Sequence, residues 1–364
     1  MPRALIAGTG KMGRDVGLFL LRKGWEVTWL TRYQERRQVF EEILHKEVRR
    51  LGRVLSKEAE PFCYHCLTFG ELKSVCADLI VENSPEDVSV KRRIMETLKI
   101  RLDDEVLLAS NSSSIFPAQI HPHCVGLHFF YPLQLTNLVE VILPETITPS
   151  REKRLMTWLR EWNIQTIIQN EQNAFAVNRL LLPLQAEVFR LLHEGMAPAL
   201  IDICSTSALL PLGQLSLMDS IGLDTLHTAI HNYVQRMPPA EQTDYTQLID
   251  SLAVLVEMGK WGRKNKNGLL CGDPLPWLEK QETPIDAESI KNCLQHLFLN
   301  TCLRFLESKQ LNRQDLNILL SSVYNGGVNW HDFETGLDKS HLKERLQACH
   351  RDTGRSYYAP AIST

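Results

Sequence analysis

The chain has 364 residues, which at about 150 residues per domain predicts two or three domains. With 44% hydrophobic and 23% charged residues it can bury a sizeable core, and this excludes a largely disordered protein. A net charge of −3 argues against a nucleic-acid binder. The sequence contains no uncharged apolar run of about 18 residues, so no membrane span is expected.

The first thirty residues have the pattern of a strand, a turn, a helix and a second strand. An apolar run at Ala4–Ala7 predicts a buried strand, helical spacing follows over 16–24, and Glu26–Thr31 predicts the second strand. In this context a GxGxxG turn makes a tight bend, lets the backbone approach a pyrophosphate and packs helix against strand. The sequence therefore predicts a dinucleotide site formed by Gly8, Gly10, Lys11, Met12 and Gly13.

The nine cysteines are odd in number and scattered, which predicts reduced thiols and a cytoplasmic location. Cys63, His65 and Cys66 are spaced like zinc ligands within a predicted strand over 62–69. No second pair follows at zinc-ribbon spacing, and a structural zinc site needs four ligands. We therefore expect no metal site.

Further strands are predicted at 79–81, 106–109 and 125–128, with polar helical segments between them. This alternation predicts an α/β, Rossmann-type doubly wound domain. After about residue 172 the pattern changes to amphipathic helices, for example over 178–194 and 248–258, with no strand signal.

The helical region contains an internal repeat with an offset of 114 residues. Gly222-Leu223-Asp224 matches Gly336-Leu337-Asp338, and Asn178 matches Asn292. Two copies of one helical unit explain this register better than chance matching of leucine-rich helices. We therefore expect three domains: a dinucleotide-binding domain over 1–172, and all-α copies over 173–280 and 281–364.

Two polar motifs follow predicted strands, at the sheet edge where α/β proteins bind ligands. One is a hydroxyl-rich cluster over 109–114; the other contains His128, with Glu140 twelve residues later. A histidine near a nicotinamide can take the proton of a substrate hydroxyl, a carboxylate can orient it, and serine or asparagine donors can hold the oxygen. A single histidine at a strand end is also common as a structural residue, so the residues alone leave both interpretations open.

The ordered motifs resemble those of the 3-hydroxyacyl-CoA dehydrogenase family, in particular the dehydrogenase half of the multifunctional fatty-oxidation alpha subunit, without its hydratase half. The motifs are GTGKMG at 8–13, ASNSSS at 109–114, GLHFFYP at 126–132, LVEV at 138–141 and VNRL at 177–180. The resemblance covers nearly the whole chain. It implies reversible hydride transfer between a 3-hydroxyacyl-CoA and NAD(H), as an oxidoreductase of fatty acid β-oxidation.

The resemblance also implies a role for individual residues. His128 falls on the family's catalytic base and Glu140 on its carboxylate partner. Ser113 and Asn178 fall on the residues that bind the 3-oxygen. Glu86 falls on a glutamate near the nicotinamide, and Lys91 on a cofactor-side lysine.

The end of the second strand departs from the family pattern. Thr31 and Arg32 stand where an acidic residue usually binds the ribose 2′-hydroxyl. Loss of the acid removes repulsion of a 2′-phosphate, and an arginine can pair with one. We hypothesise that NADP(H) is tolerated as well; a solvated arginine face with ordinary NAD(H) binding is the alternative.

A basic stripe recurs at helical spacing on one predicted helix face, at Lys46, Arg49, Arg50 and Arg53. Because coenzyme A carries phosphates, we hypothesise that part of this stripe contacts the acyl-CoA. A solvated surface is the alternative.

Two other functions remain open from the sequence. Thr31 and Arg32 favour an NADPH-dependent biosynthetic reductase acting on a 3-ketoacyl thioester, including a carrier-bound one. Tyr131 and the pair Asn173-Ala174, which depart from the family motifs, favour a catalytically silent scaffold subunit. By resemblance, the expected partner protein is a thiolase-like or hydratase subunit.

Overall fold

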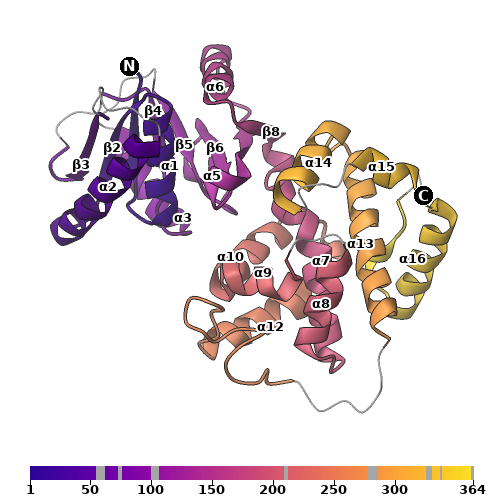
Figure 1. Ribbon diagram of the computed structural model, residues 1–364. Helices are drawn as coiled ribbons and strands as arrows, with labels where there is room; N and C mark the ends of the chain where they lie inside the picture. The colour runs from indigo at the N-terminus through magenta and orange to yellow at the C-terminus, as the bar shows by residue number, and fades with distance from the viewer. Residues whose placement is uncertain are drawn as a thin grey trace. The chain divides into compact units, whose positions relative to one another are not determined.

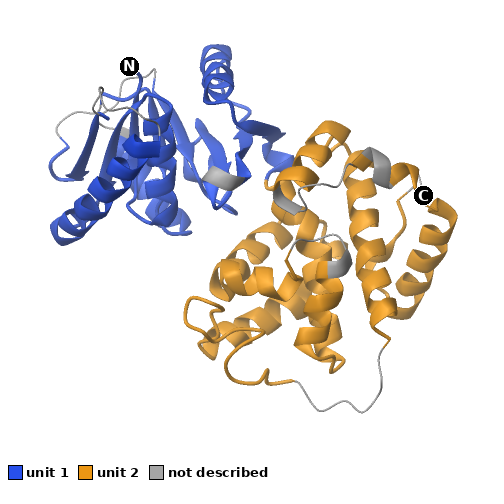
Figure 2. Cartoon of the chain, viewed as in Figure 1, with its two compact units in different colours: residues 1–174 blue, residues 175–364 orange. Residues whose placement is uncertain are grey.

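The chain forms two compact units, Met1–Ala174 and Phe175–Thr364 (Figure 2). The computed structural model describes residues 1–54, 62–72, 76–99, 106–208, 212–277, 286–324, 330–336 and 338–361. The first unit contains the sheet and the second is helical, which confirms the predicted order of an α/β doubly wound domain followed by α-helices (Figure 1).

The first unit is built on an eight-stranded sheet in the order β3-β2-β1-β4-β5-β6-β7-β8. Strands β1 to β6 run parallel, β7 is antiparallel to β6, and β8 is parallel to β7. The strands are β1 (Arg3–Ala7), β2 (Glu26–Thr31), β3 (Tyr64–Thr68), β4 (Leu79–Glu82), β5 (Leu107–Ser110), β6 (Cys124–Phe129), β7 (Leu138–Leu143) and β8 (Gln165–Asn170).

Helices cover both faces of this sheet, because successive strand residues point to opposite sides. In β1, Ala4 and Ile6 join the core under α1, α2 and α6, whereas Leu5 and Ala7 join the core under α3 and α4. The helices of the unit are α1 (Lys11–Arg22), α2 (Gln34–Val54), α3 (Val88–Lys99), α4 (Pro117–Ile120), α5 (Leu133–Thr136) and α6 (Pro149–Trp162).

Helix α1 lies close to β2 because glycines form its inner surface. The indole nitrogen of Trp29 donates a hydrogen bond of 2.9 Å to the carbonyl oxygen of Gly13. A Cβ atom on Gly17 would come within 2.0 Å of the same indole ring. The first turn of α1 is thereby fixed relative to the carboxyl end of the strands.

The second unit is a bundle of helices around α7 and α13, which pack against each other. Its helices are α7 (Ala176–His193), α8 (Pro198–Ala208), α9 (Gln214–Ile221), α10 (Leu223–Val234), α11 (Pro239–Gln242), α12 (Thr246–Glu257), α13 (Ala287–Glu307), α14 (Arg313–Leu319), α15 (Trp330–Thr335) and α16 (Lys339–Thr353).

The helix order follows the 114-residue repeat. Shifted by that offset, α7, α8, α9 and α10 fall on α13, α14, α15 and α16 in turn. Both helical copies lie in one compact unit, Phe175–Thr364. That they form two separate domains remains a prediction. The expected boundary at 280/281 and Leu337 of the repeat lie outside the described residues.

The six strands predicted from the sequence are confirmed, whereas β7 and β8 were not predicted as strands. Among the described residues, no helix is both long and apolar enough to cross a membrane. All nine cysteines are described, and none of them forms a disulfide.

Candidate active site

The glycine-rich turn between β1 and α1 has the geometry of an anion-binding loop. Gly8 has φ +134°, and a Cβ atom there would lie 2.5 Å from the carbonyl oxygen of Asn83. A Cβ on Gly13 would lie 2.3 Å from the carbonyl oxygen of Gly8, whereas one on Gly10 would meet open space. Gly10 is the N-cap of α1, whose first turn has no acidic residue. The N–H groups and dipole of this helix end therefore suit a pyrophosphate.

The other two residues of the turn have different surroundings. Met12 is partly buried and packs against the core. Lys11 is exposed, and its Nζ lies 3.4 Å from the ring centroid of Tyr131. This cation–π contact brings the glycine-rich turn together with the loop that follows His128.

The end of β2 presents a buried hydroxyl to the same sheet edge. Thr31 is 2% exposed, and its Oγ1 has no hydrogen-bond partner among the described residues. A buried hydroxyl normally has a partner, so this atom fits a ligand hydroxyl or phosphate oxygen. Arg32 is exposed, with its guanidinium 5.1 Å from the centroid of the Tyr33 ring.

Glu86 is held in a cradle of serines. Its Oε1 accepts hydrogen bonds from the hydroxyls of Ser112 and Ser114, at 2.6 and 2.7 Å, and from the backbone N–H groups of Ser113 and Ser114, at 3.1 and 2.9 Å. Burial raises the pKa of Glu86, but the charge of Lys91 and these hydrogen bonds outweigh it and leave the pKa below its usual value. Glu86 therefore stays ionised and orders the loop that carries Ser113.

Lys91 lies inside the protein, with 1% of its side chain exposed. Its Nζ donates to Oε2 of Glu82 at 2.8 Å and lies 3.4 Å from Oε2 of Glu86. Ser110 donates to the same Glu82 oxygen at 2.7 Å. These contacts favour an indirect role for Lys91, which holds Glu86 in place; the sequence analysis did not identify Glu82.

His128 and Glu140 are brought together by the antiparallel pairing of β6 and β7, in which they are directly opposite. His128 Nδ1 lies 3.0 Å from Glu140 Oε2. The histidine side chain is 8% exposed and the glutamate is fully buried. A buried carboxylate beside Nδ1 fixes the tautomer and orientation of an imidazole, as general acid–base catalysis requires.

Asn111 connects the serine loop to the histidine strand. Its Oδ1 accepts a hydrogen bond of 2.8 Å from the backbone N–H of Phe129, the residue after His128. Its Nδ2 donates to Oδ1 of Asn83 at 2.8 Å. Asn111 and Asn83 were not among the predicted site residues, although both follow strands that end at the same edge.

Asn178 lies in the second unit, in the first turns of α7. Its Nδ2 donates a hydrogen bond of 2.9 Å to the hydroxyl of Tyr233 on α10. The side chain is therefore oriented by its own unit, and its role toward substrate remains a prediction.

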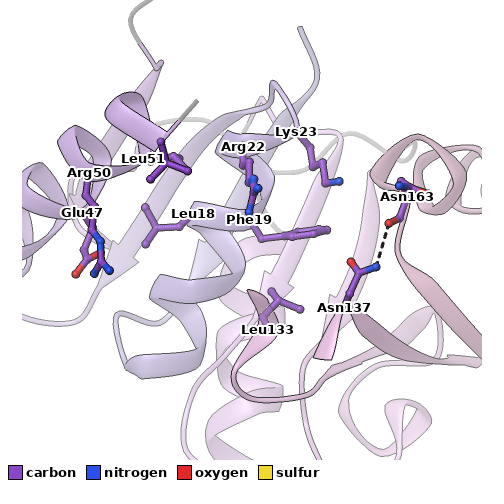
Figure 3. A pocket seen from close by; sticks show the side chains of 11 residues that line it. Leu18, Phe19, Arg22, Lys23, Glu47, Arg50, Leu51, Leu133, Asn137 and Asn163 are labelled. Carbon is purple, nitrogen blue, oxygen red and sulfur yellow. Dashed lines mark hydrogen bonds between the residues drawn. The ribbon is translucent and has the colours of Figure 1, made fainter. Parts of the chain in front are cut away.

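The basic stripe is confirmed as one exposed face of α2, formed by Lys46, Arg49, Arg50 and Arg53. Of these, Arg50 lines a pocket of about 380 Å³, together with Arg22 at the end of α1 and Lys23 directly after it (Figure 3). The remaining lining residues are Leu18, Phe19, Glu47, Leu51, Val54, Leu133, Asn137 and Asn163.

Comparison with known proteins identifies both units. The NAD-binding domain of 3-hydroxyacyl-CoA dehydrogenase matches residues 3–172, and the C-terminal domain of the same family matches residues 175–271. The fatty acid oxidation complex subunit alpha of Pseudomonas savastanoi pv. phaseolicola is 29% identical over 208 residues, which are 56% of this chain and 28% of that protein. The chain thus matches less than a third of the length of this curated relative.

Solved structures show the same fold. The 3-hydroxybutyryl-CoA dehydrogenase of Escherichia coli K12 has a TM-score of 0.75 at 18% identity, covering 100% of this chain and 97% of that one. The (S)-3-hydroxybutyryl-CoA dehydrogenase of Ralstonia eutropha has a TM-score of 0.64 at 24% identity, covering 75% and 100%. The nucleotide-binding unit and the first part of the helical unit are both matched, and the chain belongs to the 3-hydroxyacyl-CoA dehydrogenase family.

Proposed function

We propose that this protein is an oxidoreductase that interconverts a 3-hydroxyacyl-CoA and the 3-ketoacyl-CoA with NAD(H), in fatty acid metabolism. The observation that carries the proposal is the buried His128–Glu140 pair, at a sheet edge of the family's NAD-binding domain. The curated relative named fatty acid oxidation complex subunit alpha supports the substrate class.

The chain's own residues can accept the proton that leaves the 3-hydroxyl group of the substrate. Because Glu140 accepts from the Nδ1–H of His128, Nε2 is the nitrogen that takes the proton of the 3-hydroxyl group. The carboxylate then stabilises the imidazolium that forms. Ser113 and Asn178 are assigned, by resemblance, to hold the 3-oxygen as its charge changes.

The residues at the glycine-rich turn fit a dinucleotide. Gly10 leaves open space at the end of α1, and the hydroxyl of Thr31 is buried without a partner among the described residues. Gly8, Gly10 and Gly13 would hold the pyrophosphate, and Thr31 would face the adenosine ribose. When bound, the nicotinamide supplies the hydride acceptor or donor.

Three further assignments belong to this proposal. Arg50, Arg22 and Lys23 at the pocket beside α2 would bind coenzyme A phosphates, so the double variant Arg49→Glu/Arg50→Glu should raise the acyl-CoA KM.

Assembly with a thiolase-like or hydratase subunit is supported by the curated relative, which is named as a subunit of a complex. The nine cysteines, none of which forms a disulfide, suit a reducing compartment such as the cytoplasm.

The test is the oxidation of NADH with acetoacetyl-CoA. His128→Gln should lower kcat by about 10²–10⁴-fold, because it removes the base but keeps the size of the side chain. The matched control is His123→Gln, since His123 is exposed and outside the predicted site, with its Nδ1 3.2 Å from the hydroxyl oxygen of Thr146. Wild-type activity in His128→Gln, or no turnover by the wild type with either NADH or NADPH, would contradict the proposal.

A further inference from the structure

Strands β2 and β3 place three potential metal ligands on one face of the sheet. Val27 pairs with Tyr64 and Thr28 pairs with His65, so Glu26, the first residue of β2, lies beside Cys63, the residue before β3. Alternate residues of a strand point to the same side. Glu26, Cys63 and His65 therefore share a face.

The three side chains converge on one another. Cys63 Sγ lies 4.0 Å from His65 Nε2, which lies 3.7 Å from Glu26 Oε1, and the three ligand atoms all fall within 4.8 Å of each other. Around a tetrahedral zinc ion, with bonds of about 2.0–2.3 Å, neighbouring ligand atoms are about 3.3–3.6 Å apart. The distances between the three ligand atoms would therefore have to shorten by a few tenths of an ångström to about one ångström for all three atoms to bind the same ion.

The donor set selects the class of ion. A thiolate and an imidazole exclude the oxygen-seeking cations Ca²⁺ and Mg²⁺ and suit a borderline-soft divalent ion. We propose that Glu26, Cys63 and His65 bind a zinc-class divalent ion, with water as the fourth ligand. The side chains of His65 and Glu26 are 56% and 28% exposed, so the ion can enter from solvent.

This site differs from the one that the sequence analysis considered and rejected. Cys66, the second cysteine of that motif, is 5% exposed and packs in the core, on the opposite face of β3. The third ligand is Glu26, which lies on the neighbouring strand and could not be found from the spacing of cysteines and histidines along the sequence. The site is at the amino end of β2, whereas Thr31 and the glycine-rich turn are at the carboxyl ends of their strands, so the inference is independent of the proposed dehydrogenase activity.

Bound metal would fix β3, which stands at the edge of the sheet among the described strands, to its neighbour β2. The competing explanation is an ordinary surface ion pair between His65 and Glu26 beside an unconnected thiol. The two explanations differ in one observable property, because only a metal site places a thiolate on the ion.

The experiment is titration of the full chain with Co²⁺, whose thiolate charge-transfer absorption reports the sulfur ligand, followed by displacement with Zn²⁺. We expect one equivalent to give the absorption and Cys63→Ala to abolish it. Loss of outer partners of a metal site costs about 10–100-fold in affinity, so His65→Ala and Glu26→Gln should each weaken binding by at least that factor. The matched controls are Cys76→Ala and Cys271→Ala, because both cysteines are exposed and outside the group.

Four results would overturn the proposal: no thiolate band in the wild type, a band that survives Cys63→Ala, a band lost in a control variant, or unchanged affinity in both His65→Ala and Glu26→Gln. Thermal unfolding gives a second readout. Zn²⁺ should raise the Tm of the wild type but not that of Cys63→Ala, since only an ion bound to the native state stabilises it. An equal rise in both proteins would also overturn the site.

Discussion

His128 and Glu140 are directly opposite each other on β6 and β7, with Nδ1 and Oε2 3.0 Å apart. The pair depends on a single reversal of direction in the sheet, since β7 is antiparallel to β6. The strand ladder therefore positions both side chains, and the geometry of the proposed catalytic pair is set within the buried part of the sheet.

Glu140→Gln should lower kcat by about 10²–10⁴-fold, because an amide cannot stabilise the imidazolium and can favour the wrong tautomer of His128. Initial rates with acetoacetyl-CoA and NADH measure this. The KM for NADH should stay nearly unchanged, because Glu140 does not belong to the predicted cofactor set. A variant with full kcat would show that the pair is structural.

The position of the polar residues at this edge could be predicted from the sequence because the glycine-rich turn follows β1, the serine cluster begins at the end of β5 and His128 lies near the end of β6. The spacing of twelve residues between His128 and Glu140 did not reveal their pairing. The missing information was that β7 is a strand, and that β8, with its alternating exposed residues, extends the sheet beyond it. The resemblance to a family assigned the pair, and the register explains it.

Lys91→Met should destabilise the nucleotide-binding unit by about 3–5 kcal/mol, because it leaves the buried carboxylate of Glu82 and the partly buried carboxylate of Glu86 without their cation. Hydrogen exchange of the β4 and β5 amides measures the stability of this unit directly. The double variant Lys91→Met/Glu82→Gln should recover part of the loss, since it removes one of the two uncompensated charges. A raised KM for NADH with normal exchange would instead indicate direct cofactor contact.

Glu86→Gln should make the free energy of unfolding less dependent on pH in the acidic range. The folded pKa of Glu86 lies below its ordinary value of 4.5, so its charge stabilises the native state above about pH 4.5. That contribution is lost as the pH falls through the folded value. The wild type should therefore be more stable than the variant at pH 7, and the difference should shrink below about pH 4.5. Thermal unfolding over this range measures it, and the exposed Glu42→Gln should follow the wild type.

The nucleotide preference depends on the end of β2. If Arg32 pairs with a 2′-phosphate, Arg32→Ala should raise the KM for NADPH about tenfold and leave that for NADH unchanged. Thr31→Asp should further disfavour NADPH, because a carboxylate there repels the phosphate. Steady-state kinetics with both nucleotides decide this. A clear preference for NADH that Arg32→Ala does not alter would contradict the NADP(H) hypothesis.

Other features escaped prediction because they join side chains from different helices and strands. Glu82 closes the buried cluster around Lys91 from the end of β4, and Glu26 meets Cys63 across two strands. Local patterns identify strands, turns and helix faces, whereas contacts between neighbouring strands depend on the sheet order.

The helical unit contains a thiol pair that offers a test independent of catalysis. A hydrogen bond from Cys293 lowers the pKa of Cys349 to about 7, despite partial burial, while the pKa of Cys293 itself is raised. Cys293 Sγ also lies 3.0 Å from the hydroxyl of Tyr358.

Because the thiolate is the nucleophile, alkylation of Cys349 by iodoacetamide should reach half of its maximal rate near pH 7. Cys293→Ala should move that midpoint upward, toward the ordinary thiol range of about 8.5. Mass spectrometry of the alkylated peptides measures each site, with the exposed Cys76 and Cys271 as internal references. Equal midpoints for Cys349 and these references would show that the hydrogen bond does not form in solution.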